Sequence, residues 1–425
     1  MDPDLGSFLI SKQQQIRDFA ETITNKVPPV VWRFFDAVRV DDWETATNLA
    51  ARINLASHRY SLSTNEDTMT PALGTLIWPP ISESFGAYGQ FHDWNNIWLH
   101  RFGSEIIKSI PPGSIYFGGT DPGRFVISTL CESQVRGTPF FTLTQNQLVD
   151  MAYLDYLHTM YGKRINIPNT NDLQNAFTNY TADVARRRKL GQLKPGEDVH
   201  MVGEKAQVSG VVAVMQINGR LVKNIFDENP AREFFVEESY PLDWMYPYLS
   251  PHGLIFQLNR QPLKDTFDLE VIQNQVYWKK LSDEALGGWL DDKTSVKEVC
   301  TFAEKYAYGK KLENYAGDKS FAENAETRKA FSKLRSAQAG LYAWRAQQAT
   351  DPNERDRLNQ AADLAFRQSY AICPYSPEAI YRYINLLLSR SRFDDAILIA
   401  KTSVHLDPDN EQFKHLLNQI MTYRR

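Results

Sequence analysis

Cysteine is scarce in this chain of 425 residues, and the three that occur are far apart, at Cys131, Cys300 and Cys373. No two of them form a CxxC pair, so the sequence predicts neither a disulfide framework nor a structural zinc site. The net charge of −4 provides no broad positive field, which argues against nucleic acid as a partner. Long apolar runs are missing too. No stretch approaches about 18 consecutive apolar residues, so no membrane-spanning helix is expected.

Complete catalytic motifs and export signals are also absent. The chain has no His-Glu-x-x-His, Gly-x-Ser-x-Gly or kinase-like set, so we predict no catalytic group, metal or cofactor. The N-terminus MDPDLGSFLISKQQQ carries acidic residues where a signal peptide carries cations, and its apolar stretch is short. These features favour a cytoplasmic protein that is not an enzyme on its own.

Hydrophobic residues make up 43% and charged residues 23% of the sequence, the balance of an ordinary globular protein. The length predicts at least two folding units of roughly 150 residues each. Four segments differ in pattern: a helical aromatic-rich region at 1–110, an α/β domain at 111–262, a helical connector at 263–325 and tetratricopeptide-like helical repeats at 326–425. We therefore predict an α/β fold with a small, mostly parallel sheet and flanking helices, followed by all-α helical hairpins.

Alternating strand and helix patterns define the predicted α/β domain. Strands are expected at 115–117, 139–143, 234–237 and 254–258. Helices are expected at 125–135, 148–157 and 171–184. The stretch 208–226 is apolar nearly all round and should be buried, and Thr144 with Gln147 has the spacing of a capping box. Strand, loop, helix and strand in this order predict a right-handed parallel unit.

The C-terminal third has a sequence period. Pro374 and Pro408 are about 34 residues apart, which is the period of a tetratricopeptide repeat. Two pairs of small residues repeat with the same spacing, Ala362 with Ala396 and Ser369 with Ser403. Small residues let two helices approach closely, and a proline ends the second helix. The pattern predicts helical repeats that bind a partner polypeptide or a second copy of the chain.

The boundaries of these repeats are predicted from local signals. The last repeat begins at Ser376-Pro377, an N-cap with proline at the first helical position. The preceding repeat is degenerate: the helix 330–348 forms its first half, and an insertion at 351–360 splits it. In the connector, Ser295 and Glu298 form a capping box for a helix that should end at Gly309.

The most distinctive candidate site is a glycine-rich loop between a predicted strand and a predicted helix. Its residues are Gly118, Gly119, Thr120, Asp121, Gly123 and Arg124. Such a loop presents free backbone N–H groups to an anion or a sugar hydroxyl, and Arg124 would clamp a phosphate or carboxylate. The spacing fits neither nucleotide-binding motif. A tight turn, with Asp121 capping the helix and Arg124 packed outward, explains the same residues.

A second candidate group consists of Glu237, Glu238, Asp243 and His252. These residues surround the ends of the two later strands and would complete a crevice beside the loop, because open α/β sheets bind ligands at strand ends. In the alternative interpretation, Asp243 caps a short helix at 244–249 and both glutamates are solvated.

An aromatic cluster consists of Tyr88, Phe91, His92, Trp94, Trp98 and His100. Stacking on sugars is one interpretation of these rings. Core packing is favoured, because Phe91, Trp94 and Trp98 have the spacing of one helical face. The two histidines are not placed as a metal pair.

The segment Pro112-Gly113-Ser114-Ile115-Tyr116-Phe117-Gly118-Gly119-Thr120-Asp121, together with 234–258, resembles the soluble portion of a bacterial membrane-protein family related to protein O-mannosyltransferases. Members of that family have a strand ending in a Gly/Asp/Thr loop and a later Leu-Gly-Leu-like stretch, whose counterpart here is 248–254. The arrangement with a repeat tail also resembles hypothetical tetratricopeptide-repeat proteins of Verrucomicrobia-like bacteria. The likeness covers most of the chain.

This resemblance implies an accessory portion of a glycosyltransferase system, with membrane components as partners and an extracytoplasmic location. Related transferases place their catalytic carboxylate between transmembrane helices, which this sequence lacks, so transfer activity is not implied. Two functions follow. The first is a protein-interaction or assembly protein that uses its C-terminal repeats, and the alternative is a sugar- or nucleotide-binding accessory domain. The sequence leaves localisation open between cytoplasm and extracytoplasmic face.

Overall fold

The computed structural model describes residues 1–23, 25–58, 62–63, 68–131, 139–202, 205–263, 267–307 and 312–423. Contacts divide the chain into two compact units. Unit 1 comprises Met1–His92 and Ile110–Phe234, and unit 2 comprises Asp93–Ser109 and Phe235–Arg425. The predicted segment boundaries at 110, 262 and 325 stay predictions. In the described ranges, no helix is both long and apolar enough to cross a lipid bilayer.

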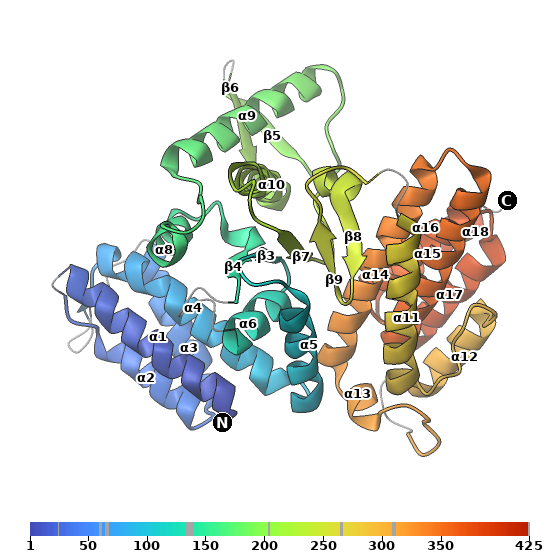
Figure 1. Cartoon of the computed structure of the whole chain (residues 1–425), viewed down its shortest axis with the longest axis horizontal. Helices are drawn as coiled ribbons and strands as arrows, with labels where there is room; N and C mark the ends of the chain where they lie inside the picture. Colours follow the sequence, from blue (N-terminus) through green and yellow to red (C-terminus); the bar gives the residue numbers. More distant parts are fainter. Residues whose placement is uncertain are drawn as a thin grey trace. The chain divides into compact units, whose positions relative to one another are not determined.

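Unit 1 begins with helices, as the sequence predicts for this region. They are α1 (Pro3–Thr22), α2 (Pro29–Arg39), α3 (Trp43–His58) and α4 (Pro71–Asp93), with a short hairpin of β1 (Leu62–Ser63) and β2 (Thr68–Met69) before α4 (Figure 1). Asp2 starts α1 by accepting a hydrogen bond from Asp4 N at 2.9 Å, and Pro3 occupies the first helical turn. Ile16 and Phe34 are fully buried in this helical part.

The second part of unit 1 contains the predicted parallel strand pair. Its elements are β3 (Ile115–Gly118), α6 (Asp121–Leu130), β4 (Phe141–Thr144), η1 (Gln145–Gln147), α8 (Met151–Tyr161), α9 (Thr170–Lys189), β5 (Asp198–Val202), β6 (Lys205–Ser209) and α10 (Gly210–Glu228). Strands β3 and β4 are parallel and in register from Ile115 opposite Phe141 to Gly118 opposite Thr144. Both strands are buried along their whole length. The predicted strand, helix, strand unit is therefore confirmed, and residues 132–135 of its predicted helix lie outside the described ranges.

Two local predictions in unit 1 are wrong. Thr144 makes no side-chain capping bond and is followed only by the 3-10 turn η1, while α8 starts later, where Asp150 accepts from Ala152 N at 2.9 Å. Helix α10 is not buried all round, because Val211 is 77% exposed and Val214 43% exposed. An apolar run therefore predicts the presence of a helix, but it does not predict which faces of that helix are covered by other elements.

The sheet is mixed, which corrects the prediction of a mostly parallel one. Its strand order is β4-β3-β7-β9-β8, where β7 is Phe234–Glu237, β8 is Leu249–His252 and β9 is Ile255–Leu258. β9 pairs antiparallel with both β7 and β8. β8 and β9 form a tight hairpin whose turn places Gly253 at φ 57°, and a hairpin joins only antiparallel strands. Strand β8 was not predicted, because the pattern around its first residue, Leu249, indicates a short helix at 244–249, which is observed as η2 (Asp243–Tyr248).

Unit 2 is mainly helical. Its helices are α5 (Asn96–Ser109), α11 (Phe267–Leu286), α12 (Val296–Tyr306), α13 (Lys319–Glu323), α14 (Ala325–Gln348), α15 (Pro352–Ile372), α16 (Pro377–Ser389), α17 (Phe393–Leu406) and α18 (Glu411–Tyr423). From α14 to α18 each helix packs against the next, and α14 also contacts α16 (Figure 1). The fold is thus α/β with a helical C-terminal part, as predicted.

Of the helix boundaries predicted in unit 2, one is confirmed and another is wrong. The capping box is confirmed: Glu298 N donates to Ser295 Oγ at 3.3 Å and Ser295 N donates to Glu298 Oε2 at 2.7 Å. Gly309 lies outside the described residues. The predicted insertion at 351–360 is wrong, because these residues form the first half of α15, capped by Asp351 and anchored by Leu358, which is 2% exposed. Its many charged residues are the solvated face of an amphipathic helix.

Candidate functional site

The predicted loop residues from Gly118 to Arg124 lie together in one turn at the end of β3. Thr120, rather than Asp121, caps α6, because its hydroxyl accepts from Gly123 N at 3.2 Å. Asp121 instead accepts from Arg124 Nη2 at 2.7 Å. The Arg124 guanidinium lies 4.3 Å from the centre of the Phe125 ring. The Thr120 hydroxyl and the Asp121–Arg124 ion pair therefore make contacts within the turn, while the buried Nε of Arg124 has no hydrogen-bond partner among the described residues.

Backbone groups of the same turn also have internal partners. Tyr116 OH donates to Gly123 O at 2.7 Å, and Asn146 Nδ2 donates to Gly119 O at 2.9 Å. A Cβ atom on Gly118 would lie 2.7 Å from Gly123 O, so only glycine fits this close approach. Through Asn146 the exit of β3 is joined to the exit of β4. The geometry is that of a closed βα turn, and binding of a ligand by these residues stays a prediction.

A buried ion pair near the strand ends was not predicted from the sequence. Lys12 of α1 is 2% exposed and Glu83 of α4 is 7% exposed, and the ammonium group contacts Glu83 Oε2 directly. Tyr156 OH of α8 lies 2.8 Å from both charged groups. The three residues link α1, α4 and α8. No local signal marks them, because a lysine at one position of a helix is ordinarily on its solvated face.

Burial controls the protonation of this cluster. The pKa of Lys12 is lowered by its burial, and the Glu83 carboxylate only partly offsets this shift. Burial and the Glu83 charge both raise the pKa of Tyr156, and the same two causes raise the pKa of Tyr153. Tyr153 OH accepts from Thr144 N at the exit of β4, at 2.7 Å. Both phenols stay protonated at neutral pH, so the cluster fixes helices to the strand ends and offers no phenolate for catalysis.

The second predicted group is not solvated at its glutamates. Glu237 is 1% exposed and Glu238 is 4% exposed, which corrects that interpretation. Burial raises the pKa of Glu238, whose carboxylate accepts from Tyr240 N at 3.0 Å. Asp243 begins η2 without capping it, since the residue at the cap is Leu242 and makes no side-chain bond. His252 Nε2 lies 2.8 Å from Ser109 O. A shared crevice formed by these four residues stays a prediction.

Three residues of the aromatic cluster are buried and pack in the core, which was the favoured interpretation of this cluster. Tyr88, Trp94 and Trp98 are 3%, 7% and 1% exposed. Within unit 2, Trp98 donates from Nε1 to Asp318 Oδ2 at 3.2 Å and packs on Phe321, with ring centres 4.6 Å apart. Its surface is therefore not available to stack on a sugar.

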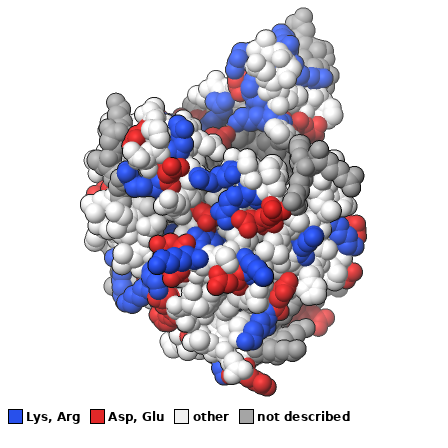
Figure 2. All heavy atoms as spheres, turned by 90° about the vertical axis from the view of Figure 1, so that its right-hand side faces the viewer, with Lys and Arg blue, Asp and Glu red and all other residues white. Residues whose placement is uncertain are grey.

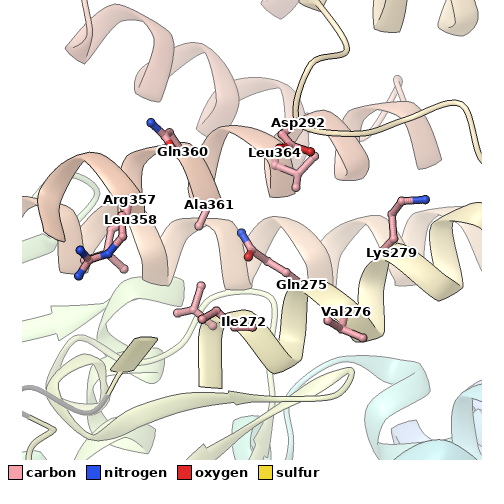
Figure 3. Close-up of a pocket in the computed structure, with 11 residues that line it drawn as sticks. Ile272, Gln275, Val276, Lys279, Asp292, Arg357, Leu358, Gln360, Ala361 and Leu364 are labelled. Carbon is pink, nitrogen blue, oxygen red and sulfur yellow. The ribbon is translucent and has the colours of Figure 1, made fainter. Parts of the chain in front are cut away.

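A groove between α11 and α15 is an open pocket in the described part of unit 2. It has a volume of about 610 Å³ and is lined by Val271, Ile272, Gln275, Val276, Lys279, Asp292, Arg357, Leu358, Gln360, Ala361 and Leu364 (Figure 3). Val271, Leu358 and Ala361 form a buried apolar floor, at 6%, 2% and 3% exposure. This groove was not predicted from the sequence, because its floor joins two helices that are distant in the chain.

The rim of the groove combines exposed apolar groups with charges. On α11, Ile272 is 56% exposed and Val276 is 67% exposed, and both lie on the side that lines the groove. Figure 3 shows Lys279 toward one end of the groove and Arg357 toward the other, with Gln275 between the two helices. Exposed aliphatic side chains one helical turn apart, beside an apolar floor, are typical of a surface that receives another apolar face.

Charge is mixed on the face of the molecule drawn in Figure 2. Lys and Arg side chains lie interspersed with Asp and Glu side chains among the other residues of that face, in agreement with the net charge of −4.

No family model, curated protein or solved structure matches this chain. The resemblance to a family related to protein O-mannosyltransferases therefore stays a prediction.

Proposed function

We propose that this chain is a protein-interaction protein whose C-terminal helices are tetratricopeptide-like hairpins and whose partner docks in the groove between α11 and α15. The hairpin part rests on the repeated positions. Ala362 and Ala396 are both 0% exposed, and Ser369 and Ser403 are 0% and 1% exposed. Helix α15 ends just before Pro374 and α17 just before Pro408, where the two prolines of the period stand.

Close helix contact at these small residues also supports the hairpin proposal. Ser332 Oγ of α14 donates to Ser369 O of α15 at 2.8 Å, and Ser369 Oγ donates back to Ser332 O at 2.8 Å. Such reciprocal bonds require the two backbones to approach closely, which larger side chains would prevent. Packing of α14 on both α15 and α16 is the order expected when the first helices of successive repeats are neighbours.

The inner face of these helices is already occupied by the chain itself. Arg345 of α14 donates to Pro247 O at 2.9 Å and to Leu263 O at 2.9 Å. Arg382 of α16 donates to Ser239 O and lies 4.0 Å from the centre of the Tyr240 ring. An extended partner peptide would compete with this internal segment. The open groove on the α11 side is therefore the better docking surface.

The single observation that carries the proposal is the pair Ile272 and Val276, more than half exposed beside a buried apolar floor. The groove suits an amphipathic helix with an apolar stripe, from a partner or from a second copy of the chain. Fully burying an exposed Val or Ile side chain contributes about 1.5–3 kcal/mol. Covering these two side chains, which are 56% and 67% exposed, contributes part of that range each, and charging them would remove the gain.

The test compares Ile272→Asp with Val211→Asp in the full chain. Val211 is another exposed β-branched aliphatic side chain, 77% accessible on α10 of unit 1, and serves as the matched control. Sedimentation velocity measures self-association, and quantitative affinity capture from the native source measures partners. The proposal expects a complex that forms with wild type and Val211→Asp and weakens at least tenfold with Ile272→Asp. A chain that is monomeric, and whose captured proteins are the same for all three forms, would overturn it.

A second candidate function is the sugar- or nucleotide-binding accessory domain. The observation that favours it is the position of the loop, where the exits of two parallel strands meet at Gly119 and Asn146. Ligands of open α/β sheets bind at such strand ends. Arg124→Ala should then abolish ligand-induced thermal shifts while the fold persists, and an absence of shifts across nucleotides and nucleotide-sugars with wild type would exclude this function.

A further inference from the structure

Unit 2 contains a buried guanidinium that no carboxylate neutralises. Arg335 of α14 is 0% exposed and makes no ion pair with any residue that the structure describes. Its Nε donates to Gln368 Oε1 at 2.8 Å, and its Nη1 donates to Asn274 Oδ1 at 2.8 Å and to Gln338 Oε1 at 3.2 Å. All three acceptors are neutral amides. A buried charge held only by neutral groups retains much of its desolvation cost.

Two N–H groups of the same cluster lack an acceptor. Arg335 Nη2 and the indole Nε1 of Trp278 are buried and have no hydrogen-bond partner among the described residues. The side chains are in contact, because the guanidinium carbon lies 5.1 Å from the centre of the Trp278 ring. Trp278 is 0% exposed as well. Buried donors are almost always satisfied in folded proteins, so this pair calls for an acceptor that the chain does not supply.

We propose that Arg335 Nη2 and Trp278 Nε1 bind a small inorganic monoanion of the halide class inside unit 2. Guanidinium and indole nitrogens can only donate, so the occupant must accept and cannot be a cation. A single negative charge would neutralise the arginine. Both anchoring side chains are closed off from solvent, which favours a monatomic ion over a larger carboxylate or phosphate. Burial lowers the pKa of Arg335 to about 10, so the guanidinium remains charged at neutral pH.

The surrounding network holds the arginine in place for such an ion. Tyr342 OH donates to Asn274 Oδ1 at 2.6 Å, and Gln368 Nε2 donates to Ser282 Oγ at 3.3 Å. These bonds fix the amides so that their oxygens face Nε and Nη1, which leaves Nη2 as the remaining donor. The anion would thus be bound by residues of α11 and α14 and would stabilise their contact. This site is independent of the groove proposed for partner docking.

The first test measures the unfolding temperature of the full chain in sodium gluconate, with chloride or bromide substituted at constant ionic strength. Ligand binding to the folded state predicts a saturable rise in the unfolding temperature with halide concentration. Arg335→Met should abolish this rise. The matched control is Arg328→Met, because Arg328 is also buried, at 4% exposure, and donates to backbone carbonyls such as Ile372 O. The control should lose stability and keep the halide dependence.

A second test uses only the wild-type chain, so it tests the anion site even if Arg335→Met fails to fold. Crystals of the wild-type chain grown with bromide should show an anomalous peak at hydrogen-bond distance from Arg335 Nη2. A water molecule alone at that position, or no bromide there at saturating concentration, overturns the proposal. An unfolding temperature that rises equally in wild type and in Arg335→Met also overturns it, because the halide effect would then arise elsewhere.

Discussion

The two units of the chain bury a positive charge in different ways. In unit 1 the ammonium of Lys12 contacts the carboxylate of Glu83, which comes from another helix, and a phenol bonds to both. In unit 2 the guanidinium of Arg335 is held by amide oxygens, and one of its nitrogens has no acceptor among the described residues. A complete charge pair suggests a structural role, whereas an incomplete donor set suggests a site. Substitutions in each unit test this difference.

Glu83→Gln should give the largest effect, because it leaves the Lys12 charge buried without its counter-ion. Breaking a buried pair by removing one partner costs about 3–5 kcal/mol. Urea unfolding followed by tryptophan fluorescence measures the loss. The control is Asp36→Asn, which removes one half of an exposed pair, 63% accessible at the carboxylate, and should change stability by under about 1 kcal/mol.

The double variant Lys12→Met/Glu83→Leu tests whether the stability lost in Glu83→Gln comes from the unpaired charge of Lys12. Replacing a whole buried pair by apolar groups is often neutral or stabilising, so most of the stability lost in Glu83→Gln should return. A double variant that is as unstable as Glu83→Gln would show that the pair does more than balance its own charges.

Gly118→Ala should cost about 1–3 kcal/mol in unit 1, the range expected when a group is forced into a packed site. The added Cβ would lie 2.7 Å from Gly123 O and 2.9 Å from Gly123 C, so the backbone of the turn must move. Urea unfolding measures the change. A loss near zero would mean that the turn is looser than its contacts indicate.

Gly340→Ala should act in the opposite direction in unit 2. Gly340 lies within α14, and a Cβ there meets nothing within 4 Å. Alanine lowers the entropy of the unfolded chain and favours helix, so a gain of about 0.5–1 kcal/mol is expected. The same unfolding experiment serves for both glycines, and a loss of stability here would contradict the open environment assigned to this position.

Glu238→Gln should give the smallest effect, and one that depends on pH. Burial raises the pKa of Glu238, and the Arg382 charge partly opposes that shift. Because the folded pKa lies above the unfolded value of 4.5, the stabilising contribution of this group is complete below that value and is lost as pH rises through the folded pKa. The glutamine variant should therefore gain stability relative to wild type as the pH rises above 4.5. Glu411→Gln, 81% exposed, is the control, and an equal response of both variants would contradict the assignment.

Short-range signals in the sequence predicted the fold well. The capping box at Ser295 and Glu298, the helix start at Ser376-Pro377 and the parallel pair around Gly118 depend on neighbouring residues, and the structure contains them. The same rule failed at Thr144, because a capping pattern also occurs where only a 3-10 turn follows. The charged stretch 351–360 was misjudged because a solvated helical face and a polar insertion have similar composition.

The sites were harder to predict because they join distant segments. Lys12 and Glu83 are 71 positions apart, and nothing near either residue indicates that its charge is buried. The groove joins α11 to α15, and its exposed Ile272 and Val276 are indistinguishable in sequence from core residues. Periodicity identifies the apolar face of a helix, while only the packing of other elements decides whether that face is covered.

Any peptide that binds the inner surface of the C-terminal helices must displace the internal segment held by Arg345 and Arg382. Because Ser239 and Pro247 belong to the same chain as the arginines that bind them, 143 and 98 positions away, their association is intramolecular and does not incur the loss of translational and rotational freedom that a separate ligand incurs on binding. A free peptide must offset that loss to displace the segment. Evolutionary change on that inner surface is therefore expected to follow the tethered segment, and not an external ligand.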